Sequence, residues 1–359
     1  MIKKWCLLVS FSYFIIACED NGINTYVPYA PTPAPLEIPQ LFADNIIDPV
    51  IPFDNPQTVE GIALGRKLFF DPILSGDNTK SCSDCHAPEA AFSDQNRFSE
   101  GIDGLLGSRN SMPIFNLAWN YDELFFWDGH AFSLENQAFE PVVSPIEMHS
   151  DWQINADKLN GHPEYPELFR KVFGEIEIDS ILVTKALAQF QRTLISANSR
   201  FDQYLLGDLN LSAEEMEGFN VFMDETRGDC FHCHGNQFNP LWTDNLFHNN
   251  GLDSNFSDLG LGEHTGNPED NGKFRTPSLR NLAFTAPYMH DGRFTTLDEV
   301  INHYSEGLQN SPTIDPLMKS VHEGGVQLTP DDKAALKAFL LSLSDESFIN
   351  NPNFQNPNP

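Results

Sequence analysis

The chain has 359 residues, of which 40% are hydrophobic and 23 are glycine, so it is long and apolar enough for two ordinary folded domains. Acidic residues number 51 against 21 lysines and arginines, which gives a formal net charge of −30 at pH 7. Such a surface repels nucleic acid, whose phosphates require basic contacts, and it either serves solubility or attracts a basic protein partner.

The N-terminus is typical of an export signal. Residues 1–17 contain two lysines followed by an apolar run that is too short to span a bilayer comfortably. The run IIAC, which ends at Cys18, resembles the lipobox of a bacterial lipoprotein. We therefore expect an exported protein, either periplasmic or held on the bacterial envelope only through a lipid on Cys18. A plain secretory signal or a short anchor helix is the alternative.

Two segments are expected to lie outside the folded domains. Residues 18–44 contain the proline-rich run VPYAPTPAPLEIPQ, which predicts an extended tether. Residues 346–359 end in NNPNFQNPNP, a composition that predicts a disordered tail.

Helical periodicity dominates the rest of the chain. Over residues 181–206 apolar side chains recur at intervals of three and four, with Ser180 as N-cap and Gly207 after the end, so one long amphipathic helix is predicted. The run TPDD at residues 329–332 marks another helix start. Further helices are predicted over 57–69, 132–139, 165–173, 212–224 and 296–304. Because no segment alternates as a strand would, the predicted fold class is mainly α, with long connecting loops that suit the wrapping of a large flat cofactor.

The motif Cys-x-x-Cys-His occurs twice, far apart in the chain. Two thiols at this spacing add to the two vinyl groups of one haem, and the adjacent histidine supplies an axial ligand to its iron. The sequence therefore predicts two covalently bound c-type haems. The residues concerned are Cys82, Cys85 and His86 for the first haem and Cys230, Cys233 and His234 for the second.

Other uses of these cysteines are disfavoured. The chain has 6 cysteines, and the two outside the motifs are Cys6 in the signal and Cys18 at its end. A four-sulfur zinc site would have to join two distant pairs and would ignore the histidine after each. A thioredoxin-like dithiol expects alternating strands and helices around the motif, which the sequence lacks.

Activity at a haem depends on whether its iron keeps an open position. Between residues 87 and 129 there is no histidine, and Met112 is the only methionine, which favours an open first haem. Glu147 lies in the run SPIEMHS, and a carboxyl above an open haem can move protons during O–O cleavage. An ordinary surface glutamate is the alternative for Glu147.

Over residues 45–345 the chain resembles the bacterial di-haem cytochrome c peroxidases. The resemblance rests on the two haem motifs and on the runs LGRKLFFDPILSGD, GSRNSMPIFNLAWN, FFWDGHAFSLENQAFEPV, SPIEM and KFRTPSLRNLAFTAPYMHDGRFTTLDEVINHY. It implies two cytochrome c-like haem domains: a peroxidatic one at 45–207 and an electron-transfer one at 208–345. It also implies hydrogen peroxide as substrate, a small donor protein for the second haem, and a homodimer, as relatives often form.

The resemblance assigns roles to four residues around the first haem. Glu147 matches the distal acid and Gln137 the distal amide, while Pro141 matches the proline that lines their pocket. Trp127 matches the tryptophan between the haems. An ordinary buried core tryptophan is the alternative, because the sequence would look the same. A further match implies an interdomain calcium site formed by Asn110 and the carbonyl groups of Thr285 and Pro287, whose oxygens suit calcium.

Three departures from the family pattern bear on activity. The run FSEGIDGLLGSRN has no histidine to close the first haem, so no reductive activation is expected. The position that supplies methionine to the second haem in many relatives is Tyr304, as in the di-haem enzymes that mature a tryptophan-derived quinone; Met289 and Met318 are rival ligands. His130 replaces the usual arginine after Trp-Asp-Gly.

These observations predict a di-haem peroxidase that takes electrons from a small, basic cytochrome c. One alternative is a maturation-type oxidase that modifies a side chain of another protein through a high-valent haem, which Tyr304 favours. The other is a di-haem electron carrier without enzymatic activity, which requires two axial ligands on each iron.

Overall fold

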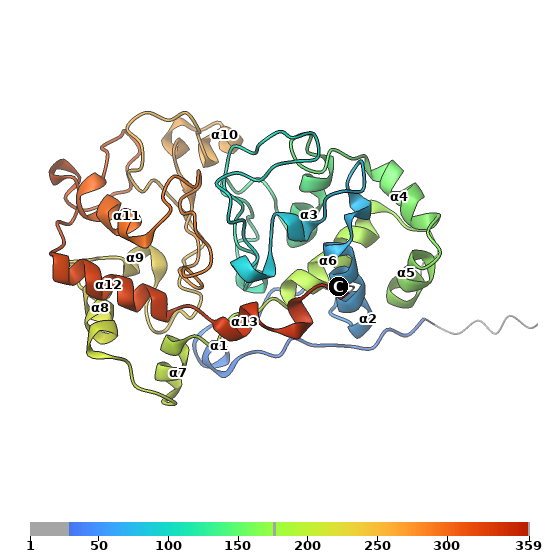
Figure 1. Ribbon diagram of the computed structural model, residues 1–359, viewed down its shortest axis with the longest axis horizontal. Helices are drawn as coiled ribbons and strands as arrows, with labels where there is room; N and C mark the ends of the chain where they lie inside the picture. The colour runs from blue at the N-terminus through green and yellow to red at the C-terminus, as the bar shows by residue number, and fades with distance from the viewer. Residues whose placement is uncertain (1–28, 175–176, 358–359) are drawn as a thin grey trace, which may run out of the picture.

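The protein is described by a computed structural model that covers residues 29–174 and 177–357 (Figure 1). The export signal, with Cys18, lies outside the described residues. Helices dominate the described chain, and its one sheet pairs two short antiparallel strands, β1 (Phe247–His248) and β2 (Phe274–Arg275). The prediction of a mainly α fold is confirmed. Among the described helices, none is both long and apolar enough to cross a bilayer.

The N-terminal lobe is built on the crossing of two helices, α2 (Val59–Phe70) and α6 (Ser180–Arg192). A Cβ atom on Gly65 would lie 1.9 Å from the carbonyl oxygen of Ala186, so only glycine allows this approach. Three further helices complete the lobe: α3 (Leu134–Val143), α4 (Trp152–Asn160) and α5 (Tyr165–Phe173). Their apolar faces meet in one core that includes Leu68, Phe169 and Phe190.

The C-terminal lobe repeats this arrangement with α8 (Ala213–Met223) and α12 (Pro330–Ser342). Here a Cβ atom on Gly218 would lie 1.9 Å from the carbonyl oxygen of Ala335. The lobe also contains α9 (Phe231–His234), α10 (Leu261–Thr265) and α11 (Leu297–Asn302), the last continuing into a π-helical turn, η6 (His303–Gly307). Figure 1 shows the two lobes side by side, with α3 and α6 in one and α9 and α11 in the other.

The single helix predicted over 181–206 is wrong, because the chain forms two helices there. The first, α6, ends at Arg192, and α7 (Arg200–Leu206) begins after a capping box between Ser199 and Asp202. Asp345 accepts three hydrogen bonds from the linker between them, so this linker is held by the C-terminal end of the other lobe. Asp179, rather than Ser180, caps α6.

The boundary between the lobes lies in this linker and not at residue 207, where the sequence predicted it. Phe201 of α7 is fully buried in the C-terminal core, with its ring 5.4 Å from Trp242 and 5.1 Å from Phe339. The division at residue 207 therefore places α7 in the wrong lobe. The change of lobe falls within residues 193–199.

The tether predicted over 18–44 is wrong for its described part. The hydroxyl of Tyr29 donates to the carbonyl oxygen of Val172 at 2.6 Å, which holds the chain against α5. Residues Gln40–Asn45 form α1, and the fully buried Phe42 packs its ring 5.0 Å from that of Trp119. Prolines keep this segment extended, but its apolar side chains bury themselves against the core.

The disordered tail predicted over 346–359 is wrong for residues 346–357. The chain forms α13 (Glu346–Ile349) and a 3-10 helix, η8 (Pro352–Phe354), and leads back from the C-terminal to the N-terminal lobe (Figure 1). Phe348 and Phe354 are buried beside Phe92 in the N-terminal core. These two aromatic anchors, together with hydrogen bonds from the Arg66 guanidinium to the carbonyl oxygens of Pro352 and Gln355, hold the tail against the N-terminal lobe.

Candidate functional site

Two large cavities open between the helices, and each contains one Cys-x-x-Cys-His motif. The first lies in the N-terminal lobe and has a volume of about 2090 Å³ including its mouth, while the second lies in the C-terminal lobe and has about 1650 Å³. Each cavity holds the two cysteines and the histidine of its motif in its wall, among mainly apolar side chains. Each is therefore suited to the covalent attachment of a large, flat, mostly apolar cofactor such as a haem.

The first motif folds as a 3-10 turn, η2 (Cys82–Asp84), with Ser81 and Asp84 forming a capping box. The backbone amide of His86 donates to the carbonyl oxygen of Cys82 at 3.0 Å, which brings the thiols and the imidazole to one wall of the first cavity. Nδ1 of His86 lies 2.9 Å from the carbonyl oxygen of Phe92. This contact places the proton on Nδ1 and leaves Nε2 free to bind a metal.

The second motif is carried by α9 and lines the second cavity. Burial lowers the pKa of His234 to about 4, so its imidazole is neutral and can act as a ligand. None of the four motif cysteines forms a disulfide, so all four sulfurs are available for thioether bonds to haem.

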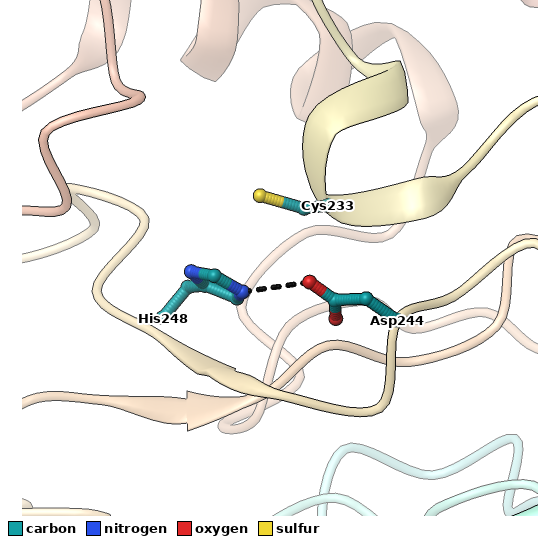
Figure 2. A group of neighbouring side chains, drawn as sticks. All are labelled: Cys233, Asp244 and His248. Atoms are coloured by element: carbon teal, nitrogen blue, oxygen red, sulfur yellow. Dashed lines mark hydrogen bonds and ion pairs between the residues drawn. The ribbon is translucent and has the colours of Figure 1, made fainter.

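The two cysteine pairs line different cavities, so they do not form a four-sulfur zinc site. One further cluster with metal-ligating groups contains Cys233, Asp244 and His248, whose ligand atoms lie within 4.8 Å of one another (Figure 2). His248 is held at 2.9 Å from Asp244 and 2.6 Å from Asp315. These hydrogen bonds raise the pKa of His248 to about 9, which makes it a cation in the wall of the second cavity.

The predicted distal residues lie together in the first cavity. Gln137 and Pro141 are on α3, and Glu147 follows on the turn after it, where its amide donates to the carbonyl oxygen of Ser144 at 3.1 Å. Burial raises the pKa of Glu147. The side-chain oxygen of Gln137 is buried without a partner among the described residues, so this amide is available to a ligand.

Trp127 stands between the two cavities and lines both. Its side chain is 8% exposed, and Nε1 donates to the carbonyl oxygen of Asn110 at 2.8 Å. The backbone of Trp127 also accepts a hydrogen bond from the amide of Arg275 at 2.9 Å. The indole is thus fixed at the junction of the two lobes.

All three candidate ligands for the second haem iron line the second cavity: Tyr304, Met289 and Met318. Tyr304 lies on the π-helical turn η6, a rare local geometry that is frequent at functional sites. The side-chain amide of Asn250 donates to the Tyr304 oxygen at 3.2 Å and to the Met289 sulfur at 3.6 Å. Burial raises the pKa of Tyr304 to about 12. The choice of Tyr304 stays a prediction.

The residues expected to hold calcium, Asn110, Thr285 and Pro287, also share the wall of the second cavity. The side-chain amide of Asn110 donates to the carbonyl oxygen of Asn96 at 3.0 Å. Calcium requires six to eight oxygen ligands, so these three groups supply only part of a coordination shell, and the calcium site stays a prediction.

Three residues that received no role from the sequence reach the same region. His130 lines the first cavity, with its Nδ1 2.5 Å from Asp128, and Arg109 joins that carboxylate to Asp258 of the C-terminal lobe. The run WDGH places Asp128 and His130 two residues apart, which hinted at this contact. Arg275 lines both cavities, and no local pattern pointed to it.

A fold with one Cys-x-x-Cys-His cavity in each lobe defines a class of di-haem protein, and comparison with known proteins gives the family. The family model for di-haem cytochrome c peroxidases matches residues 59–210. The methylamine utilization protein MauG of Methylorubrum extorquens is 38% identical, over 82% of this chain and 81% of its own. Cytochrome-c peroxidase IdrP1 of Pseudomonas sp. strain SCT is 33% identical, over 94% and 91%.

A solved structure supports the same family assignment. A MauG-like protein associated with microbial copper homeostasis is 36% identical and superposes with a TM-score of 0.80, covering 90% of this chain and 99% of its own. The chain belongs to the di-haem cytochrome c peroxidase family, and it carries the residues to attach two c-type haems, one in each cavity.

Proposed function

We propose that the protein reduces hydrogen peroxide to water with electrons from a small donor protein. The observation that carries this proposal is the Glu147 carboxyl, which shares a cavity with His86 and has a pKa raised by burial. When bound, the haem supplies the iron that binds and reduces peroxide. Glu147 gives a proton to the departing oxygen, and the unpartnered amide of Gln137 orients the peroxide.

Electrons enter at the second haem and cross to the first near Trp127, which lines both cavities. Relatives named cytochrome-c peroxidases support a cytochrome c as donor. The net charge of −30 favours a basic one, whose encounter is steered by charge and weakened by salt.

The proposal is tested by peroxide turnover of Glu147→Gln. Loss of general acid catalysis lowers kcat by roughly 10²–10⁴-fold. Glu89→Gln is the matched control, because Glu89 is an exposed acid close to the first motif that does not line the cavity. Equal turnover of Glu147→Gln and the parent would remove Glu147 from the reaction.

The proposal also assigns one cytochrome c-like haem domain to each lobe. The matching helix crossings, at Gly65 and Ala186 in one lobe and at Gly218 and Ala335 in the other, support this repetition. Export, a lipid on Cys18, calcium at Asn110 and a homodimer complete the proposal. Mass spectrometry of the matured protein, which would show an acylated Cys18 as the first residue, tests the export and lipid assignments.

A second candidate function is the oxidation of a side chain on another protein. The 38% identity to a MauG protein and the place of Tyr304 in the second cavity favour it. Peroxide added to the diferric protein discriminates between the two. A long-lived oxidised spectrum with poor turnover of reduced cytochrome c would favour the second candidate, and rapid turnover would favour the first.

A further inference from the structure

Arg275 is a buried cation between the two haem cavities. Its side chain is 6% exposed, and the residue lies on β2 of the C-terminal lobe. It lines both haem cavities and a smaller cavity between them. The guanidinium carbon lies 5.9 Å from the ring centre of Phe125, which lines the first cavity. The charge therefore reaches from one lobe towards the haem cavity of the other.

The guanidinium has no carboxylate partner among the described residues. Three arginines of the described chain are buried, and the other two are paired: Arg280 with Asp202 at 2.7 Å and Arg192 with Glu135 at 2.8 Å. In Arg275, one terminal nitrogen donates to the side-chain oxygen of Asn245 at 2.5 Å, and Nε is buried without a partner.

An unpaired buried charge of this kind costs several kcal/mol, so a fold that keeps it implies a missing anion. Burial lowers the pKa of Arg275 to about 10, and the carboxylate of Asp122, which opposes this shift, forms no ion pair with it. The first cavity has three acids in its wall, Glu100, Glu140 and Glu147, and none forms an ion pair with Arg275. Among the described residues, the one acid in the wall of the second cavity, Asp229, is paired with Lys319 at 2.7 Å instead. The protein itself therefore does not supply the anion.

We propose that Arg275 is a carboxylate-binding site and that it holds a propionate of the first haem from across the lobe boundary. The planar guanidinium matches a carboxylate with two parallel hydrogen bonds, and its unpartnered Nε is one of the donors required. Phe125 holds the guanidinium against the first cavity, and Asn245, which lines the smaller cavity, binds one of its terminal nitrogens. This inference rests on the two haems and not on the proposed peroxidase activity.

The proposed contact links haem binding to the electron path. The backbone amide of Arg275 holds the carbonyl oxygen of Trp127, so one residue of β2 positions both the indole between the haems and the propionate. A cation beside the first haem disfavours its ferric state and raises its reduction potential. The charged and titratable groups that face the first cavity, besides His86, are Lys80, Arg109, His130, Glu100, Glu140 and Glu147. Those that face the second cavity, besides its motif and its tyrosines, are Asp229, His248, His290 and Lys319, and Asp122 acts on Arg275 from outside both.

The test compares haem-loaded Arg275→Gln, Arg275→Lys and the parent. The midpoint potential of each haem is measured by spectroelectrochemistry across pH. For Arg275→Gln we expect a lower potential at the first haem, with a new pH dependence, because the unpaired propionate takes up a proton as pH falls. Arg275→Lys keeps the positive charge but lacks the planar guanidinium that can form two parallel hydrogen bonds, so its shift in the first-haem potential is smaller.

The control is Lys273→Gln, which removes the same charge two residues away, from a side chain paired with Asp270 that lines neither haem cavity. Both midpoint potentials of Lys273→Gln should equal those of the parent.

A first-haem potential unchanged in Arg275→Gln would overturn the proposal, and a shift confined to the second haem would overturn the assignment of the propionate to the first haem. If Arg275→Gln does not load haem, the propionate bending band in the resonance Raman spectrum decides: it should differ between Arg275→Lys and the parent, and an identical band would overturn the proposal.

Discussion

The indole nitrogen of Trp127 donates to the carbonyl oxygen of Asn110 at 2.8 Å, and this bond fixes the ring between the two haem cavities. Replacing Trp127 with phenylalanine leaves a buried carbonyl oxygen without its donor, which lowers the free energy of unfolding by about 1–3 kcal/mol. If electrons cross here, the same change slows transfer from the reduced second haem to the first.

Stopped-flow spectroscopy of the half-reduced protein measures that rate. Trp152→Phe is the matched control, since the Trp152 indole is also buried and donates to a backbone carbonyl, that of Phe139 at 3.3 Å, but lines neither cavity. Equal transfer rates in the two variants would exclude Trp127 from the path.

The raised pKa of Glu147 predicts the pH dependence of turnover. Burial shifts this pKa above that of an ordinary glutamate, and general acid catalysis requires the protonated carboxyl. Turnover is therefore expected to be high below the raised pKa and to fall as pH rises through it. A profile of kcat/KM against pH shows this limb in the parent, and Glu147→Gln should lack it. Persistence of the limb in the variant would assign it to another group.

The crossing of α2 and α6 predicts a strong effect of one methyl group. In Gly65→Ala the new Cβ would meet the Ala186 carbonyl oxygen at 1.9 Å, so the helices must separate, and we expect a loss of about 1–3 kcal/mol or more in the free energy of unfolding. Gly107→Ala, whose Cβ would meet nothing closer than 3.6 Å, is the control. Urea denaturation of both variants compares them directly, and equal midpoints would contradict the close packing.

The C-terminal strap, residues 346–357, should stabilise the N-terminal lobe. Phe348 is 2% exposed in that core, so Phe348→Ala is expected to cost about 3–5 kcal/mol and to release the strap to protease. Phe238→Ala, at a side chain that is 65% exposed, serves as the control. Limited proteolysis followed by mass spectrometry locates the first cuts. A strap that resists cleavage equally in both variants would show that other contacts hold it.

The sequence predicted those helix bounds and caps that depend only on residues close together in the chain. Helix α5 covers Tyr165–Phe173, the range given by its periodicity, and Thr329 forms the capping box with Asp332 that the run TPDD implies. The single helix predicted over 181–206 is wrong because apolar periodicity continues through the linker at 193–199, whereas the capping box of Ser199 and Asp202 starts a second helix.

The assembly of the site depends on contacts between distant parts of the chain. Glu147 shares a cavity with His86 because the fold brings α3 and the first motif, which are far apart in the chain, to the walls of one cavity. The run SPIEMHS made Glu147 a candidate acid, but only resemblance to the family assigned it and Trp127 to positions in the site, because a single residue in a sequence does not show what lies opposite it. Arg275 escaped prediction for the same reason, as its lack of a partner is a property of the fold alone.

Electron paramagnetic resonance of the resting, oxidised protein tests the central claim most directly, because it reports the coordination of both irons at once. Besides His86, the first cavity contains Met112, Met148 and His130 as further candidate ligands. We predict a high-spin ferric signal from a first haem with an open position, together with a low-spin signal from the second. Two low-spin signals, or no haem signal at all, would contradict the account.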